Sequence, residues 1–275
     1  MHFTKVHGAG NDFILIDIRK EQERDYNAMA PKLCHRQTGI GADGLLLLMK
    51  SNEADIRMRI INKDGSNAEM CGNGIRAFAM YAYVAGIVSK LEFAVETDAG
   101  IMRPRLILDE NGHVASVRVN MGKPGLLCSE VPVVGEGQCL NRTLEALGKS
   151  FTYSAVRMGN PIAAVPVEDP KTFDLYTYGP AIEKHPLFPE HTNVAFFKVL
   201  DRENVEMRIW ERGAGPTLAC GTGSCGTAVL CAENGLTERS VNIHLELATL
   251  HIDWEEDGTV YMTGPAELVF DGEVY

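Results

Sequence analysis

Two stretches of the sequence place a cysteine directly before a glycine-rich helix start. Cys71 begins the run Cys-Gly-Asn-Gly at 71–74, and Cys220 begins the run Cys-Gly-Thr-Gly at 220–223. Apolar residues at helical spacing follow each run, so each cysteine is predicted to lie at the N-terminus of a helix. The unpaired N–H groups and the positive dipole end found there bind anions and favour the thiolate form of a cysteine.

Two thiols of this kind suit the inversion of a carbon centre. A thiolate removes a proton from one face of the carbon while a thiol on the other face returns one, and the roles exchange in the reverse direction. The helix N-termini would clamp the α-carboxylate of an amino acid and stabilise the negative charge that develops as the Cα proton leaves. This scheme requires no electron-accepting cofactor, and we predict none. The remaining cysteines are interpreted as ordinary buried thiols: Cys34, Cys128, Cys139, Cys225 and Cys231.

The sequence matches itself at an offset of 149 residues. Five blocks share this offset without a gap: Gly10-Asn11 with Gly159-Asn160, Gly44 with Asn193, Met58-Arg59-Ile60 with Met207-Arg208-Ile209, Cys71-Gly72 with Cys220-Gly221, and Gly86 with Gly235. One shared register indicates a duplication, which predicts two similar halves related by a pseudo-twofold axis. Corresponding loops would meet at the interface, and Cys71 and Cys220 are therefore expected to face each other across one site.

Hydrophobic periodicity predicts a strand-rich protein with one prominent helix in each half. The predicted helices span 21–36, 72–86, about 170–183 and 221–234. The predicted strands span 3–7, 13–18, 45–49, 56–60, 91–97, 101–108, 114–120, 152–158, 162–167, 193–200, 205–210, 241–254 and 259–270. The helix after Cys71 is apolar on nearly every side, so it is expected to be buried and wrapped by the strands of its own half.

Composition argues against several classes of function. With 275 residues, 45% hydrophobic content and a net charge of -11, the chain is expected to form a globular protein without a nucleic-acid partner. We expect no signal peptide and no membrane partner, because neither a leader pattern nor a long apolar run is visible. Seven cysteines in no regular framework indicate reduced thiols and a cytoplasmic protein, and without a Cys-x-x-Cys pair no metal site is predicted.

Polar residues at strand ends offer hydrogen-bonding groups for a substrate. Four asparagines lie in Gly- or Pro-marked loops, and an acid–base pair follows the strand that ends at Trp210: Asn11, Asn62, Asn160, Asn193, Glu211 and Arg212. Asparagine often serves turn chemistry alone. The repeat, however, relates Asn62 to Glu211, and these loops are predicted to converge on the cysteines. There Glu211 could accept an ammonium group and Arg212 could bind a carboxylate bidentately, which suits a substrate with two amino-acid ends.

Nucleotide binding is the main alternative. Gly72-x-Gly74-x-x-Ala77 and Gly221-x-Gly223-x-x-Gly226 follow the spacing of the dinucleotide fingerprint. That motif requires an apolar strand that runs directly into its first glycine, whereas the residues before each cysteine are typical of loops. A redox-sensing protein that uses the paired thiols is a further alternative.

Together these residues resemble the diaminopimelate epimerase family, whose members do not use pyridoxal phosphate. The resemblance covers essentially the whole chain and rests on eight segments: 7–13, 39–44, 62–66, 70–76, 158–161, 192–194, 210–215 and 219–223. It implies a homodimer and two pseudo-symmetric α/β (α+β) domains, each a curled sheet around a central helix. The domains are expected at 1–118, joined by a returning C-terminal strand at about 263–275, and at 119–262.

The resemblance also implies a substrate and a role for each site residue. The expected reaction converts LL-2,6-diaminopimelate to the meso isomer, for lysine and peptidoglycan biosynthesis, with Cys71 and Cys220 as proton donor and acceptor. Glu211 is expected to bind the ammonium group of the reacting centre. The residues expected to bind the carboxylate of that centre are Gly72, Asn73, Gly221 and Thr222. Those expected to hold the rest of the substrate, mostly its distal end, are Asn11, Asn62, Asn160, Asn193 and Arg212.

One departure from the family pattern affects the expected chemistry. Ile162 follows Gly-Asn-Pro at 159–161, where the family usually has a histidine thought to tune a catalytic thiol. Glu211 or the helix dipole must then contribute more to the deprotonation of that cysteine. Racemisation of another amino acid by a related enzyme is the second hypothesis, although the retained Asn62 and Arg212 favour a substrate with a second amino-acid end.

Overall fold

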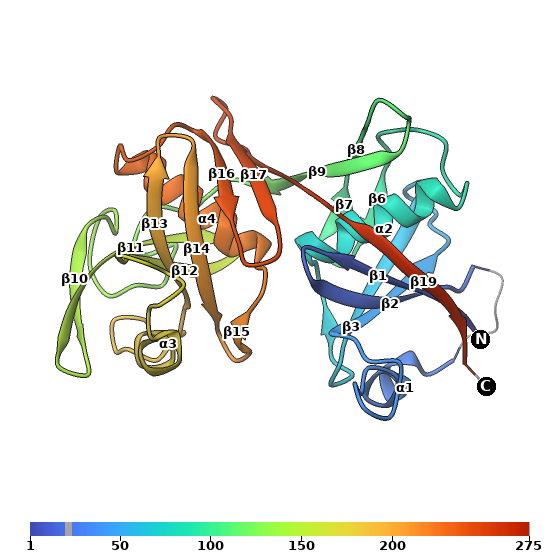
Figure 1. Cartoon of the computed structure of the whole chain (residues 1–275), viewed down its shortest axis with the longest axis horizontal. Coiled ribbons are helices and arrows are strands. Elements are labelled where there is room, and N and C mark those ends of the chain that lie inside the picture. The colour runs from blue at the N-terminus through green and yellow to red at the C-terminus, as the bar shows by residue number, and fades with distance from the viewer. Residues whose placement is uncertain (20–23, 275) are drawn as a thin grey trace. The chain divides into compact units, whose positions relative to one another are not determined.

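A computed structural model of the chain describes residues 1–19 and 24–274 (Figure 1). The chain folds into two compact units, one formed by Met1–Asn120 with Thr263–Tyr275 and the other by Met121–Met262. The divisions between them fall within β9 (Val114–Gly122) and β18 (Val260–Gly264). In the part of the chain that the structure describes, no helix is long and apolar enough to cross a membrane.

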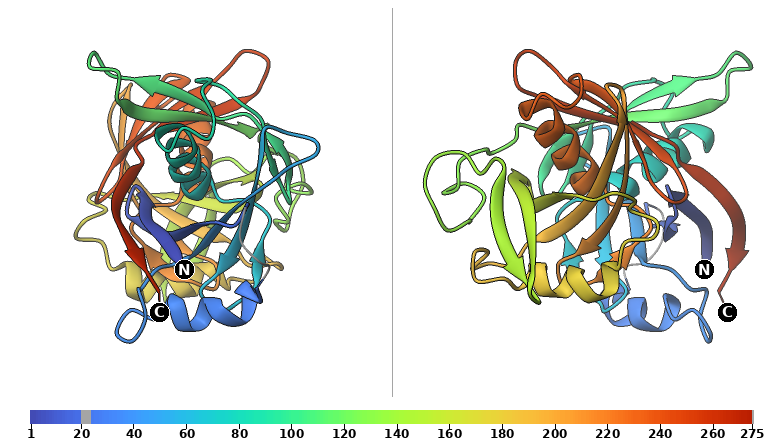
Figure 2. Two further views of the ribbon diagram at one scale, coloured as in Figure 1. Left: turned by 90° about the vertical axis from the view of Figure 1, so that its right-hand side faces the viewer. Right: turned by 60° about the vertical axis from the view of Figure 1, so that its left-hand side comes forward.

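The first unit is a mixed sheet with a helix packed against it. Its elements are β1 (His2–Gly8), β2 (Asn11–Asp17), α1 (Tyr26–Leu33), β3 (Gly44–Met49), β4 (Ile56–Asn62), β5 (Asn67–Ala68), α2 (Gly72–Val84), β6 (Val95–Thr97), β7 (Gly100–Met102), β8 (Arg105–Leu108) and β19 (Glu267–Glu273). The strands are hydrogen-bonded in the order β19-β1-β2-β3-β4-β6-β7, and β5 pairs with β4. α2 contacts β1, β2, β3, β4 and β19. Figures 1 and 2 show this helix packed against the strands of its unit.

The helix α2 is buried because apolar residues cover nearly all of its surface. Ile75 and Phe78 are fully buried, and the strands of the unit surround them. After the capping residue Ala85, Gly86 adopts a left-handed φ of +67°, which ends the helix without strain from a Cβ atom. The prediction of a helix wrapped by strands is confirmed for most of its length. It is wrong at Val84, which is 57% exposed.

The second unit has the same plan. Its elements are β10 (Arg142–Ala146), β11 (Lys149–Met158), β12 (Asn160–Pro166), α3 (Leu175–Glu183), β13 (Asn193–Asp201), β14 (Asn204–Glu211), β15 (Gly215–Thr217), α4 (Gly221–Glu233), β16 (Ser240–His244) and β17 (Thr249–Trp254). The strands are hydrogen-bonded in the order β10-β11-β12-β13-β14-β16-β17, and β15 pairs with β14. α4 contacts β11, β12, β13, β14, β16 and β17, while α3 packs on β13 and β14.

The predicted duplication is visible in the strand pairing. Along β1-β2-β3-β4-β6-β7 the pairs alternate antiparallel and parallel, and β11-β12-β13-β14-β16-β17 repeats that alternation. The register also agrees: Phe13 pairs with Gly44 in the first unit, and Ile162 pairs with Asn193 in the second. Both pairs are separated by the 149-residue offset, so the two-part fold predicted from the sequence is confirmed.

Several element boundaries differ from those predicted. The helix expected at about 170–183 begins at Leu175, because the Asp169 carboxylate accepts N–H and O–H groups of residues 171 and 172 and holds them in a turn. The helix expected at 21–36 is found at Tyr26–Leu33, and residues 20–23 lie outside the described residues. The strands expected at 91–97, 101–108, 241–254 and 259–270 are shorter or divided, as at Pro265, which has no N–H to donate. β10 was not predicted.

Candidate active site

Cys71 and Cys220 have the same local structure in their respective units. Each is the N-cap residue of its helix, with φ and ψ of -141° and 117° at Cys71 and of -131° and 111° at Cys220. The Cys71 sulfur accepts the N–H of Gly74 at 3.3 Å, and the Cys220 sulfur accepts the N–H of Gly223 at 3.4 Å. The predicted helix starts are therefore present, and each presents a thiol beside the first-turn N–H groups.

Glycine allows the backbone to approach the first of these helix starts closely. A Cβ atom on Gly8, at the end of β1, would lie 2.6 Å from the carbonyl oxygen of Asn73. The strand end thus supports the first turn of α2 directly. In the second unit, a Cβ atom on Gly223 would lie 2.2 Å from Cδ1 of Ile209 and 3.3 Å from the Cys220 sulfur.

Replacing Gly8 by Ala is expected to lower stability by about 1–3 kcal/mol, because the added methyl group meets backbone atoms that cannot rotate away. It should also raise the substrate KM by displacing Asn73. Thermal unfolding and steady-state kinetics would measure both effects. Gly86→Ala is the control: its positive φ makes the variant less stable, but nothing lies within 4 Å, so KM should not change. An unchanged KM in Gly8→Ala would contradict the role given to this contact.

The Cys71 thiol lies in a network of neutral amides. It donates to Oδ1 of Asn11 at 3.5 Å, and the same oxygen accepts Nδ2–H of Asn73 at 3.4 Å. Asn11 in turn donates to the Asp43 carboxylate at 2.8 Å. Asp43 therefore fixes the orientation of the Asn11 amide, so that its oxygen faces the thiol. This role was missed from the sequence, although Asp43 lies in one of the segments that carry the family resemblance.

Arg76 fixes the other side of the same helix start. Its side chain is fully buried. The guanidinium donates to Oδ1 of Asn73 at 2.9 Å, to the carbonyl of Gly72 at 3.0 Å and to the carbonyl of Pro265 at 3.2 Å. It thereby joins the first turn of α2 to the C-terminal segment of the chain. The sequence showed Arg76 beside the predicted site without indicating this function.

The Cys220 thiol, in contrast, faces a carboxylate. It donates to Oε2 of Glu211 at 3.1 Å and lies 3.4 Å from the Thr222 hydroxyl oxygen. The other carboxylate oxygen of Glu211 accepts the Thr217 hydroxyl at 2.5 Å. Burial, and after it the negative charge of Glu211, raises the pKa of the Cys220 thiol well above its ordinary value. Both causes favour the protonated thiol at Cys220, which is the form suited to donate a proton.

The asparagines predicted from the sequence stand at strand ends in both units. Asn62 ends β4 and donates to the Ser66 hydroxyl at 2.9 Å. Asn193 begins β13, donates to the carbonyl of Pro161 at 3.0 Å and accepts the backbone N–H of Arg212 at 2.9 Å. Oδ1 of Asn160 is buried and has no hydrogen-bond partner among the described residues. Buried polar atoms are usually hydrogen-bonded, so this oxygen is an exception among the site asparagines.

Neither helix start has the lead-in of a dinucleotide site. The strands that precede Cys71 and Cys220 are β5 and β15, of two and three residues, and each pairs antiparallel at the side of a longer strand. A dinucleotide fingerprint instead follows a central parallel strand.

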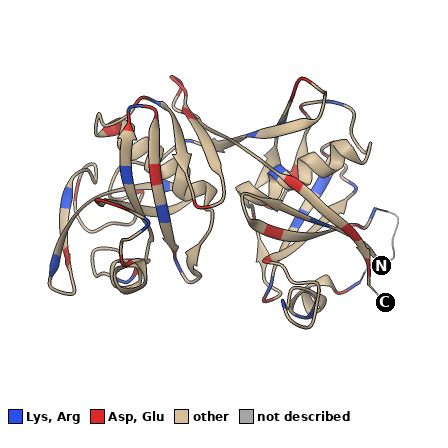
Figure 3. Cartoon of the chain, in the orientation of Figure 1, with Lys and Arg blue, Asp and Glu red and all other residues tan. Residues whose placement is uncertain are grey.

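Lys and Arg are interspersed with Asp and Glu in both units (Figure 3), in keeping with the acidic net charge of -11.

The sequence model of the family described as diaminopimelate epimerase matches residues 3–127 and 154–269. This chain belongs to the diaminopimelate epimerase family. It is 51% identical over 276 residues to the diaminopimelate epimerase of Pelotomaculum thermopropionicum, covering 99% of this chain and 98% of that protein. The diaminopimelate epimerase of Moorella thermoacetica is 50% identical over 276 residues, with 99% of each covered. In fold, the chain is similar to the solved structure of a predicted epimerase from Pseudomonas aeruginosa, with a TM-score of 0.70 and 16% identity. The match covers 99% of this chain and 98% of that structure.

Ile162 occupies the position at which the family resemblance led us to expect a histidine. It is fully buried on β12, and its Cδ1 lies 2.7 Å from the point that a Cβ on Gly226 would occupy. The side chain therefore packs on α4 and has no atom that could accept a proton. Within the described residues, the side chains that form hydrogen bonds with the Cys220 sulfur are those of Glu211 and Thr222. Glu211 is the carboxylate available to this thiol.

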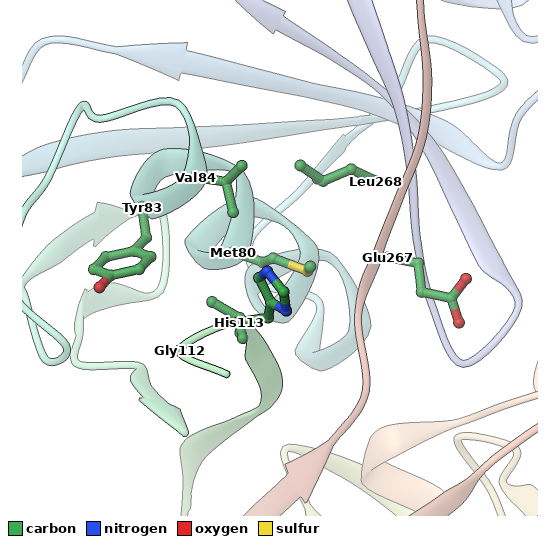
Figure 4. Close-up of a pocket in the computed structure, with 8 residues that line it drawn as sticks. Met80, Tyr83, Val84, Gly112, His113, Glu267 and Leu268 are labelled. Carbon is green, nitrogen blue, oxygen red and sulfur yellow. The ribbon is translucent and has the colours of Figure 1, made fainter. Parts of the chain in front are cut away.

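A largely apolar pocket of this diaminopimelate epimerase family member lies away from the helix starts. It has a volume of about 400 Å³ and is formed in the first unit by the end of α2, the turn before β9 and the beginning of β19 (Figure 4). Its lining residues include Met80, Tyr83, His113 and Leu268, and no predicted site residue is among them. The candidate site is identified by the cysteines at the two helix starts and the Glu211 carboxylate, and not by the volume of this pocket.

Proposed function

We propose that this chain epimerises LL-2,6-diaminopimelate to meso-diaminopimelate without a cofactor. The single observation that carries the proposal is the pair of cysteines that cap repeat-related helices, each bonded to the N–H group three residues on. One cysteine removes the Cα proton as a thiolate, and the other returns a proton as a thiol from the opposite face. Membership of the family supports diaminopimelate as the substrate.

The binding roles follow from the groups present at each helix start. N–H groups of Gly72, Asn73, Gly221 and Thr222 would hold the reacting carboxylate and stabilise the charge that develops on it. Glu211 would pair with the reacting ammonium group. Asn11, Asn62, Asn160, Asn193 and Arg212 would bind the remaining polar groups, with Arg212 on the distal carboxylate. The free acceptor on Asn160 supports an N–H-bearing ligand.

The raised pKa of Cys220 supports a starting state in which Cys220 carries the proton and Cys71 is the base. When the substrate ammonium group pairs with Glu211, the negative charge beside Cys220 is compensated, and transfer of its proton to the carbon becomes easier. After the turnover Cys71 holds a proton, and the same site runs the reaction backwards. We also propose that the domains divide at 118/119 and 262/263, and that the protein is a cytoplasmic homodimer.

Incubation with LL-diaminopimelate in D2O would test the proposal. Two bases on opposite faces predict that deuterium enters Cα of the meso product from the first turnover, while the remaining substrate stays unlabelled at low conversion. Mass spectrometry of the separated isomers would measure both. If no deuterium enters and no meso product forms, diaminopimelate is not the substrate. Assays with a panel of other amino acids would then test whether the protein racemises a different amino acid. This second hypothesis arises because Ile162 replaces the histidine expected from the family resemblance.

A further inference from the structure

Glu183, the last residue of α3, has a buried carboxylate held between two N–H donors. Its side chain is 4% exposed. Oε2 accepts Nε1–H of Trp210 at 2.7 Å, and Oε1 accepts the backbone N–H of Gly213 at 3.1 Å. These two donors immediately flank Glu211 and Arg212 in the sequence. A buried carboxylate is costly unless its oxygens are hydrogen-bonded, and here both are bonded to the segment that carries two predicted site residues.

Other contacts hold the same segment in place. The Trp210 ring lies directly on α3, because a Cβ atom on Gly179 would be 2.7 Å from its Cγ and Cδ2 atoms. Asn193 accepts the backbone N–H of Arg212 at 2.9 Å, and the Arg212 guanidinium donates to the carbonyl of Glu190 at 2.8 Å. Residues 210–213 are thus held against α3 on one side and against the start of β13 on the other.

The bonding pattern requires a carboxylate and not merely a polar residue. Two N–H donors face the two oxygens of Glu183, and an ionised carboxylate accepts at both. Glutamine has the same size but offers one acceptor oxygen and one NH2 group. It would therefore leave either Trp210 or Gly213 facing another donor, and a buried donor without an acceptor is destabilising.

We propose that Glu183 is a positioning residue that holds the Glu211–Arg212 segment in its substrate-binding conformation. The proposal rests on the proposed function, because it takes Glu211 and Arg212 to bind the substrate. Glu183 acts through the Trp210 side chain and the Gly213 backbone and does not touch the substrate itself. The position of the Glu183 carboxylate at the end of α3 thereby affects how tightly Glu211, at the end of β14, and the adjacent Arg212 bind the substrate.

The test uses Glu183→Gln made in the full-length chain with Trp254→Phe, which leaves Trp210 as its only tryptophan. Loss of one bond to a buried charged acceptor is expected to raise KM for diaminopimelate by about tenfold, with a smaller fall in kcat. The emission of Trp210 should change, and a neutral quencher should reach it more readily. Glu206→Gln is the matched control: it lies on β14, pairs with Lys171 and should alter neither KM nor emission.

A second pair of variants tests the requirement for two acceptors. In a Trp210→Phe background one donor is gone, so the glutamine introduced by Glu183→Gln can turn its oxygen to Gly213, and the substitution should then raise KM by a clearly smaller factor. Wild-type KM and unchanged Trp210 emission in Glu183→Gln would overturn the proposal. If that variant does not fold, Glu183→Asp serves instead, because its two oxygens lie on a shorter side chain: a raised KM supports the proposal and an unchanged KM overturns it.

The two proposals fail in different ways. If the parent protein does not turn over diaminopimelate, the proposed function is wrong, yet Trp210 emission and quenching still show whether Glu183 holds the segment. If the parent turns over normally and Glu183→Gln resembles it in both readouts, the positioning role is wrong and the proposed function stands.

Discussion

Serine in place of either Cys71 or Cys220 is expected to slow epimerisation by about 10²–10⁴-fold, the range lost when one general acid or base is removed. The hydroxyl group is close in size to the thiol and can still accept the N–H three residues on, so the helix start should persist. An alkoxide, however, forms far less readily than a thiolate at neutral pH. Each variant therefore lacks one of the two proton carriers. Formation of the meso isomer from LL-diaminopimelate, with circular dichroism to check folding, measures the effect.

The matched control is Cys34→Ala. Cys34 caps the C-terminus of α1, and burial raises its pKa to about 11, so it remains a thiol under assay conditions. Removing it should leave the rate within a small factor of the wild-type value. Wild-type activity in either serine variant would show that one cysteine suffices, and the two-base scheme would then be wrong.

The duplication was predictable because a shared offset constrains many residues at once. The strand registers reproduce it, since the pair of Phe13 with Gly44 recurs as Ile162 with Asn193. The positions of Cys71 and Cys220 were predictable for a related reason: helix starts have a local signature in glycine and in the apolar period that follows. Local and repeated signals therefore predicted the two-part fold and the position of each cysteine at a helix start.

The contacts that orient the site residues were not predictable from such signals. Asp43 bonds to Asn11 across 32 positions, Glu183 to Trp210 across 27, and Arg76 to Pro265 across 189. Contacts of this kind arise only when strands and helices have packed, and a single sequence carries no record of which distant residues pair. Element boundaries were missed for a simpler reason, because turn bonds such as those of Asp169 compete with the helix locally.

Glutamine in place of Glu211 is expected to lower the pKa of the Cys220 thiol and, at the same time, to slow the enzyme. The negative charge of Glu211 is the second cause of the raised pKa after burial. Removing the charge while keeping a polar group should thus bring the pKa down, although burial holds it above the ordinary value. Loss of the partner of the substrate ammonium group should reduce kcat/KM by about 10²-fold.

The opposite signs of the two effects make this variant informative. If Glu211 only kept Cys220 protonated, a thiol with a lower pKa would donate its proton to the carbon as well or better, and activity would not fall. If Glu211 also binds the ammonium group, activity falls even though ionisation becomes easier. Ultraviolet absorbance of the thiolate, taken as the difference between Glu211→Gln and the same variant carrying Cys220→Ser, would follow the titration. A titration midpoint that stays in place or rises would remove Glu211 as a cause of the high pKa. Undiminished kcat/KM would show that Glu211 does not bind the substrate ammonium group. The effect of Glu211 on the Cys220 pKa and its role in substrate binding are therefore tested separately.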